Sequence, residues 1–177
     1  MSIIVFGAQG TGKSTYAKYV AEKLNVPYIY SGDLFRQMSQ QASPLGQQIK
    51  EYVTKGLLVP DDIVISAVKE ELNKIDLSRG VVFDGFPRNL KQAQSLPVEV
   101  DLIIHITLSE KIILERLLKR GRSDDTMETI RKRLEIYDKE TAPLLKFYGE
   151  KGVKMIKIDN TPPVEIVKKQ IDDLLKE

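Results

Sequence analysis

Five short apolar runs recur along the chain and are separated by longer stretches with helical periodicity. The runs cover residues 2–6, 27–30, 80–84, 101–107 and 153–159, and they are rich in Val and Ile. Continuous apolar runs of this length are typical of strands that are buried on both faces of a parallel sheet. Because helical stretches lie between them, the pattern predicts a three-layer α/β domain.

A long helical stretch separates the second apolar run from the third. Apolar side chains recur at helical spacing in 34–41, 45–53 and 60–72. A crossover between parallel strands needs far fewer residues, so we expect an inserted helical lobe at 31–73. Farther on, the proline in 141–145 should end or kink a long helix that begins near Asp125. No repeat or linker is visible, and 1–177 is interpreted as a single domain.

Composition narrows the class of protein. Of the 177 residues, 29% are charged and the formal net charge is only +2, whereas a nucleic-acid-binding protein more often shows a basic excess. The absence of cysteine excludes disulfides and thiolate metal sites. No apolar run approaches membrane-spanning length, and the first strand begins too early for a signal peptide. We therefore expect a cytoplasmic protein with neither nucleic-acid nor membrane partners; a monomer is favoured, and an oligomer stays open.

A phosphate-binding loop follows the first apolar run. Residues 7–14 read GAQGTGKS and match the G-x-x-x-x-G-K-[ST] pattern between a predicted strand and an amphipathic helix. The glycines let backbone N–H groups surround a phosphate, Lys13 adds positive charge, and Ser14 offers a hydroxyl to Mg²⁺. The alternative is a glycine-rich turn without a ligand. The motif predicts nucleoside-triphosphate binding and leaves the acceptor undefined.

Two further features lie beyond the phosphate loop: an aspartate at the end of the third apolar run and an NKID tetrapeptide. Asp84 ends the third apolar run, where α/β sheets bind ligands, so it could hold the water shell of Mg²⁺; it could also cap the next turn. Residues 73–76, NKID, match a guanine-reading pattern of GTPases. They follow a helical stretch without the other GTPase switch element, so we interpret them as a helix terminus.

Arginines gather near the predicted phosphate loop. Arg36 and Arg88 should face each other across one cleft and form a second phosphate site, and Arg133 lies at the edge of an apolar helical stripe. Each arginine alone could instead form an ion pair, for example with Asp124 or Asp125, or extend its charge into solvent. The full set suits two phosphate chains and a transferring phosphoryl group: Arg36, Arg88, Arg116, Arg120, Arg122 and Arg133.

No residue stands out as a general base. If the acceptor is a phosphate, it is already largely ionised at pH 7, because its second pKa is about 6, and it needs no base. Positioning and charge neutralisation would then suffice. The single histidine, His105, lies within the fourth apolar run, and we interpret it as a packed structural residue.

Several motifs together resemble the adenylate kinase family of nucleoside monophosphate kinases. They are GAQGTGKST, SGDLFR, VPDDIVISAVKEEL, FDGFPRNLKQAQSL, RLLKRGRSDD, IRKRLEIYDKETAPLLKFY and IDN, in the family's order and spacing. The resemblance implies reversible transfer of a phosphoryl group from MgATP to AMP, giving two ADP. It also implies a phosphate-loop domain with a five-stranded parallel sheet and a helical lobe that binds the nucleoside monophosphate (NMP).

Residue roles follow from matching positions in that family. The implied catalytic residues are Lys13, Arg88, Arg120, Arg122 and Arg133. The implied ATP-binding residues are Gly10, Thr11, Gly12, Lys13, Ser14, Thr15, Arg116, Arg120 and Pro162, the last covering the adenine opposite Arg116. The implied AMP-binding residues are Ser31, Arg36, Leu57, Leu58, Val59, Gly85, Arg88 and Gln92. Mg²⁺ is expected to be held mainly by phosphates and water, with Ser14, Asp33 and Asp84 around it.

The chain departs from the family pattern in two places. Ser31 stands where adenylate kinases usually have threonine, which keeps the hydroxyl. Between Arg120 and Arg122 the family carries a lid loop or a small β domain, whereas here only Gly121 remains, so the lid is expected to be a tight turn at 120–124. Gln92 favours AMP, because the related UMP/CMP kinases typically have asparagine at that position.

Three alternatives stay open beside the AMP kinase. The chain could be a UMP/CMP kinase. It could be a phosphate-loop kinase of a small alcohol, with Asp33 as the base that deprotonates the hydroxyl. It could also be a non-catalytic nucleotide-binding module, in which the missing lid marks lost turnover. The retained arginines argue against this last alternative, because binding alone does not need charge aimed at a transferring phosphoryl group.

Overall fold

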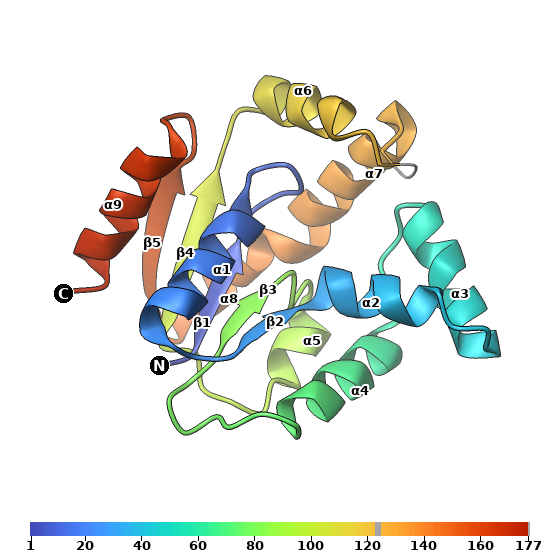
Figure 1. Cartoon of the computed structure of the whole chain (residues 1–177), viewed down its shortest axis with the longest axis horizontal. Helices are drawn as coiled ribbons and strands as arrows, with labels where there is room; N and C mark the ends of the chain where they lie inside the picture. The colour runs from blue at the N-terminus through green and yellow to red at the C-terminus, as the bar shows by residue number, and fades with distance from the viewer. Residues whose placement is uncertain (123–124, 177) are drawn as a thin grey trace.

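The computed structural model describes residues 1–122 and 125–176 as a parallel sheet surrounded by helices (Figure 1). Each predicted apolar run forms a strand: β1 (Ile3–Phe6), β2 (Tyr28–Tyr30), β3 (Val82–Asp84), β4 (Leu102–Thr107) and β5 (Lys154–Asp159). All the pairings are parallel, and the order is β2-β3-β1-β4-β5. The predicted three-layer α/β class with a five-stranded parallel sheet is confirmed.

The strand order places β1 at the centre of the sheet. Its neighbours are β3 on one side and β4 on the other, with Val5 beside Asp84 and Phe6 beside His105. From β1 the chain crosses to the edge strand β2 and returns to β3 beside β1, and it then continues on the other side of β1 through β4 to β5. Ligands of open α/β sheets bind at such a switch point, outside the carboxyl ends of the strands. The loop that follows β1 occupies this position.

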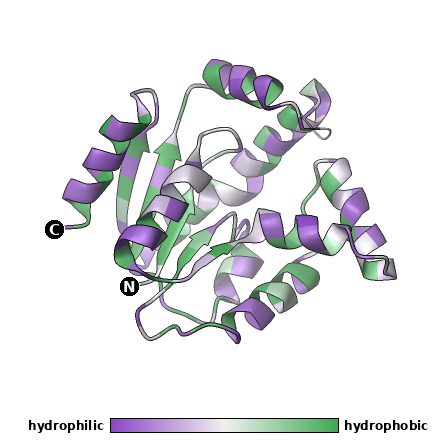
Figure 2. Cartoon of the chain, viewed as in Figure 1, coloured by the Kyte–Doolittle hydropathy of each residue, from purple (hydrophilic) through white to green (hydrophobic). Residues whose placement is uncertain are grey.

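Alternate residues of the strands face two separate cores. On one face, Ile3, Val5 and Ile104 pack against α1 (Lys13–Leu24) and α9 (Val164–Leu174). On the other, Ile4 and Phe83 pack against α4 (Asp61–Leu72), α5 (Leu90–Gln94) and α8 (Pro143–Glu150). Figure 2 shows the strands mostly hydrophobic and the outer sides of the helices hydrophilic. Burial on both faces explains the nearly continuous apolar sequences of β1 and β4, whereas the edge strand β5 is largely exposed and carries two lysines.

The stretch between β2 and β3 folds into helices, as its periodicity predicts. They are α2 (Ser31–Ser39), α3 (Pro44–Thr54) and α4. In Figure 1, α2 and α3 extend away from the sheet, and Ile49 of α3 is fully buried against the same core as Phe35 of α2. Asn73 caps the C-terminus of α4, so the NKID stretch begins at a helix end, as interpreted.

In the C-terminal half, the helix that is predicted to end or kink at 141–145 changes its hydrogen-bonding pattern next to that segment. After α6 (Glu110–Arg120) and α7 (Met127–Ile136), the helix continues as a π-helix, η1 (Tyr137–Thr141), and then as α8, which has Pro143 in its first turn. A proline cannot donate to the preceding turn, which is why the α-helical ladder changes here. Among the described residues, no helix has both the length and the apolar character needed to cross a membrane.

Candidate active site

The loop after β1 is shaped by glycine and held by one buried amide. Gly12 has φ +87°, and a Cβ there would lie 2.6 Å from Asn160 Nδ2, so only glycine fits. Asn160 directly follows β5 and is 3% exposed. Its Nδ2 donates to the Thr11 carbonyl at 2.6 Å, and its Oδ1 accepts from the Tyr16 hydroxyl. The end of β5 thus fixes the loop that leads into α1.

Lys13 begins α1 among charges of both signs. Burial lowers the pKa of Lys13, the carboxylate of Asp84 opposes that shift, and the cations Arg88 and Arg120 add to it. Asp84 is fully buried at the end of β3, and its Oδ2 accepts from the Tyr28 hydroxyl at 2.9 Å. Burial, followed by the charge of Asp84, raises the pKa of Tyr28, so the phenol stays a donor. Asp84 Oδ1 has no hydrogen-bond partner within the described part of the chain.

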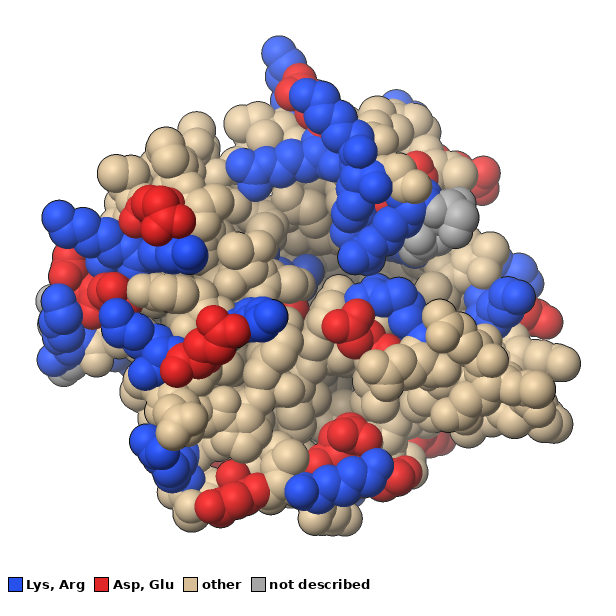
Figure 3. All heavy atoms as spheres, viewed as in Figure 1, with Lys and Arg blue, Asp and Glu red and all other residues tan. Residues whose placement is uncertain are grey.

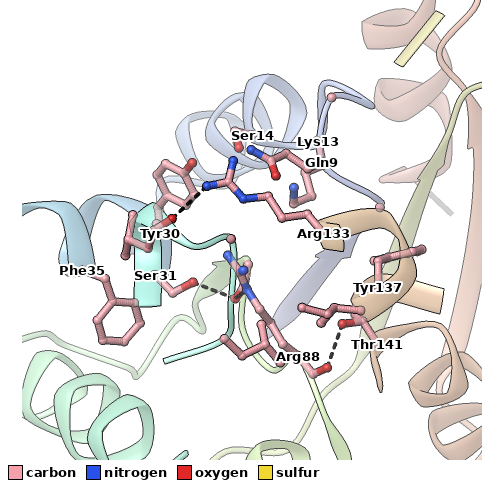
Figure 4. Close-up of a pocket in the computed structure, with 18 of the residues that line it drawn as sticks. Gln9, Lys13, Ser14, Tyr30, Ser31, Phe35, Arg88, Arg133, Tyr137 and Thr141 are labelled. Atoms are coloured by element: carbon pink, nitrogen blue, oxygen red, sulfur yellow. Dashed lines mark hydrogen bonds between the residues drawn. The ribbon is translucent and has the colours of Figure 1, made fainter. Parts of the chain in front are cut away.

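A cavity of about 510 Å³ opens at the carboxyl edge of the sheet, and most of the predicted site residues line it (Figure 4). Those residues are Gly10, Gly12, Lys13, Ser14, Thr15, Ser31, Asp33, Arg36, Leu57, Leu58, Val59, Gly85, Arg88, Gln92, Arg116, Arg120, Arg122 and Arg133. Thr11 and Asp84 lie behind this lining, with exposed fractions of 2% and 0%. Segments far apart in the sequence therefore meet at one cavity.

One end of the cavity is built from the turn after β3. Gly85 has φ +73°, and a Cβ there would lie 2.8 Å from Ser31 Oγ, whose hydroxyl donates to the Gly85 carbonyl at 2.6 Å. Arg88 Nε donates to the same carbonyl at 2.7 Å. Burial lowers the pKa of Arg88, and the charge of Asp84 opposes this shift. The turn therefore holds the Arg88 guanidinium beside Ser31 and toward the cavity (Figure 4).

Arg36 approaches this end from α2. Its guanidinium pairs with Asp33 and lies 5.2 Å from the centroid of the Tyr30 ring. The Asp33 side chain is 60% exposed. Because an ion pair with this much exposure is weak, Arg36 can exchange Asp33 for another anion.

The other side of the cavity is lined by arginines of α6 and α7. Arg120 donates two hydrogen bonds of 2.7 Å to Asp125, and Arg133 Nη1 lies 3.4 Å from the same carboxylate. Arg133 Nη2 also donates to the Val53 carbonyl at 3.1 Å. Figure 3 shows lysine and arginine side chains gathered beside the hollow on this face. The alternative of an ion pair with Asp125 is therefore present for both Arg120 and Arg133; Asp124 lies outside the described residues.

Two expected features differ from the rest of the predicted site: Pro162 lies away from the cavity, and the turn at 120–124 is described only in part. Pro162 is not in the cavity lining but borders a separate shallow groove beside Lys157 and Gln170. Arg116 does line the cavity, and its Nη2 donates to the Asn160 carbonyl at 3.3 Å. The tight turn expected at 120–124 includes residues 123 and 124, which lie outside the described residues. Gly121, at φ +65°, ends α6.

Sequence reasoning missed several residues that contact the site. In the amide orientation that satisfies both partners, the Gln9 oxygen accepts from Arg120 Nη2 at 2.9 Å and from Arg133 Nη1 at 3.0 Å. Thr141 in the π-helix donates to the Arg88 carbonyl at 2.7 Å (Figure 4). Gln9 lies inside the recognised loop motif, so its position signalled a contact; nothing in the local pattern marked Thr141.

His105 lies closer to the site than a purely structural interpretation suggests. Its Nε2 is 3.2 Å from the hydroxyl of Tyr137, which lines the cavity. Burial, with a smaller effect of Lys157, lowers the pKa of His105, which favours the neutral ring. His105 therefore supports Tyr137 from behind without entering the cavity lining.

Comparison with known proteins is consistent with this geometry. The family model described as adenylate kinase matches residues 5–153. Adenylate kinase 1 of Synechocystis is 40% identical over 98% of this chain and 96% of its own length. The adenylate kinase of Corynebacterium diphtheriae is 42% identical over 85% of this chain and 87% of its own. The adenylate kinase of Thermobifida fusca is 37% identical over 99% of this chain and 98% of its own length. The chain belongs to the adenylate kinase family.

Proposed function

We propose that this protein transfers the γ-phosphoryl group of MgATP reversibly to AMP, giving two ADP. The observation that carries the proposal is a single cavity that joins a phosphate loop, a second arginine-lined end with a buried amide, and arginines between them. Two nucleotides can therefore meet with their phosphates facing each other. Family membership supports the same activity, because the relatives are named adenylate kinases.

The ATP phosphates are assigned to the loop and the start of α1. The N–H groups of residues 10–15 and the Lys13 ammonium would hold the β- and γ-phosphates. Arg116 would lie against the adenine. Pro162 lies outside the cavity lining, so Arg116 alone is assigned to the adenine.

The acceptor is assigned to the end of the cavity near Gly85. Arg36 and Arg88 would bind the AMP phosphate, and Ser31 with 57–59 would surround the nucleoside. An AMP phosphate is largely ionised at neutral pH, so its oxygen can attack without a general base. Arg120, Arg122 and Arg133 then neutralise the charge that spreads over the transferring group, which is the main catalytic contribution in such reactions.

The residues around Lys13 fit a magnesium ion. Asp84 Oδ1 is buried without a hydrogen-bond partner in the described chain, and Ser14 supplies a hydroxyl at the start of α1. No group of three or more candidate metal-ligating side chains exists among the described residues, which suits an ion held mostly by phosphates and water. Ser14 and Asp84 would orient that ion, with Asp33 farther out, and the ion would neutralise phosphate charge.

The test offers MgATP with AMP, CMP, UMP or shikimate, a small alcohol, and measures ADP. AMP should give the highest kcat/KM, and shikimate should give no more ADP than MgATP alone. A preference for CMP or UMP would make the protein a pyrimidine nucleotide kinase. Equal ADP with and without an acceptor would make it an ATPase, and failure to turn over any acceptor would favour a binding module.

A further inference from the structure

The Gln92 amide at the acceptor end of the cavity is held from two sides. Gln92 is 1% exposed and lines the cavity. Its Oε1 accepts from the Arg88 backbone N–H at 2.8 Å, and its Nε2 donates to Asp61 Oδ1 at 2.8 Å. Asp61 is the first residue of α4, so a residue outside the cavity lining contacts the amide directly.

These two partners permit only one of the two flipped orientations of the Gln92 side-chain amide. A backbone N–H only donates, and an ionised carboxylate only accepts. Turning the amide over would place Nε2 against the Arg88 N–H and Oε1 against the Asp61 carboxylate, leaving two buried mismatches. Asn89 holds the carboxylate in place, because its Nδ2 donates to the same Asp61 oxygen at 2.7 Å.

The fixed amide keeps hydrogen-bonding capacity for a ligand. Nε2 has a second N–H and Oε1 a second lone pair beyond the two bonds described. In the fixed orientation, the free Nε2 N–H must meet an acceptor on the base, and the free Oε1 lone pair must meet a donor at the neighbouring position. Adenine supplies an acceptor at N1 and a donor at N6, and cytosine has the same pattern; hypoxanthine, guanine and uracil have the reverse.

We propose that Asp61 is a positioning residue for base specificity, which fixes the Gln92 amide so that the acceptor site selects adenine over hypoxanthine. The proposal rests on the proposed function, because the base in question is that of the acceptor nucleotide. It also ranks the pyrimidines, since CMP matches the fixed amide and UMP does not. Asp61 acts through Gln92 and need not touch the nucleotide itself.

The test compares AMP with IMP in the Asp61→Ala variant. The two nucleotides share ribose, phosphate and size, and they differ in the donor and acceptor pattern of one base edge. Losing a hydrogen bond to a charged group costs about tenfold or more, so kcat/KM for AMP should fall by about that factor. The value for IMP should change by less than about twofold, and the AMP/IMP ratio should therefore fall about tenfold.

Two further variants separate positioning from general damage. Asp61→Asn keeps an oxygen that can accept from both Asn89 and Gln92, so its AMP/IMP ratio should stay within about threefold of wild type. Asp62→Ala removes the neighbouring carboxylate, which is exposed and paired with Lys91 rather than Gln92, and it should leave the ratio unchanged.

The possible outcomes are distinct. A parallel loss for AMP and IMP in Asp61→Ala would overturn the proposal, because a structural defect affects both nucleotides alike. If Asp61→Ala does not fold, the wild-type protein still tests the fixed amide: equal kcat/KM for AMP and IMP would overturn the proposal, and a preference for AMP over IMP and for CMP over UMP would support it. A wild-type protein that does not phosphorylate AMP would contradict the proposed function instead.

Discussion

The two ends of the cavity are held together in different ways. At the acceptor end, Ser31 and Gln92 are each 1% exposed and bond to the backbone at Gly85 and Arg88. On the side of α6 and α7, the contacts are ion pairs from Arg120 and Arg133, whose side chains are 30% and 14% exposed. Hydrogen bonds to the backbone fix shape, whereas ion pairs between side chains can exchange one anion for another.

The difference separates the end of the cavity that recognises the acceptor from the side that neutralises phosphate charge. Apart from the exposed pair of Arg36 with Asp33, the acceptor end can keep its geometry whether or not a nucleotide is bound, because the hydrogen bonds of Ser31 and Gln92 are internal to the protein. The arginine side relies on Asp125, an anion that a polyphosphate can replace. We therefore expect substitutions at the acceptor end to change selectivity and substitutions on the arginine side to change the response to nucleotides.

The largest effect is expected at Arg88, which is anchored at the acceptor end and lines the cavity. Its Nε holds the Gly85 carbonyl, and its guanidinium lines the cavity. Arg88→Ala should lower kcat/KM for AMP by about 3 kcal/mol, on the order of 10²-fold, because a charge that neutralises the transition state is lost. Steady-state kinetics with MgATP measures the change.

A matched control for Arg88→Ala lies on α7. Arg131 is exposed and absent from the cavity lining, so Arg131→Ala should leave kcat/KM within about twofold. Arg88→Lys restores the charge but not the planar fork, and it should recover only part of the loss. An unchanged rate in Arg88→Ala would remove this residue from the site.

The sequence predicted those elements that a short stretch of residues specifies by itself. Strands buried on both faces must be apolar throughout, and a phosphate loop needs its glycines and lysine at fixed spacing, so both were recognisable. Strand order depends on how helices pack across the sheet, which no single run specifies. The contacts of Thr141 with Arg88 and of Asp61 with Gln92 join segments distant in the chain.

Residues missed from the site share a common property. Asp61 has the sequence context of an ordinary acidic residue at a helix start, and Asn160 that of a turn residue after a strand. Asp61 instead holds Gln92, which lines the cavity, and Asn160 holds Thr11 of the loop behind that lining. Because their roles arise from tertiary packing, a sequence pattern assigns them only a local function.

An intermediate effect is expected at Asp125, and it tests the exchange of anions directly. Asp125→Asn should lower the free energy of unfolding without nucleotide by about 1–2 kcal/mol, less than for a fully buried pair because Arg120 is 30% exposed. The added stability on binding ADP should be larger than in wild type, because the polyphosphate then supplies the missing charge.

Thermal unfolding with and without ADP measures both quantities for Asp125→Asn. Glu135→Gln, an exposed change on α7, provides the control and should leave both quantities near their wild-type values. Equal stabilisation by ADP in wild type and Asp125→Asn would show that Asp125 does not compete with phosphates. The contrast between the two ends of the cavity would then fail.

The smallest effect is expected at Lys13, as the uptake of a fraction of a proton when ADP binds. Burial lowers the pKa of Lys13 below 10.5, and the charges of Arg88 and Arg120 act in the same direction. A bound polyphosphate stabilises the ammonium and raises that pKa, so ADP binding should take up a fraction of a proton. The uptake should grow as the pH rises from neutrality toward 10.5, because more of the free-site lysine is then neutral.

Calorimetry in two buffers with different ionisation enthalpies, at about pH 9, measures this proton uptake; ADP is fully ionised there and contributes none. Lys13→Arg provides the matched control, because a guanidinium carries the same charge and does not titrate in this range. The arginine variant should bind ADP without taking up a proton. Equal uptake in both proteins would place the titrating group elsewhere, and the absence of uptake in wild type would show that Lys13 is already fully charged in the free site.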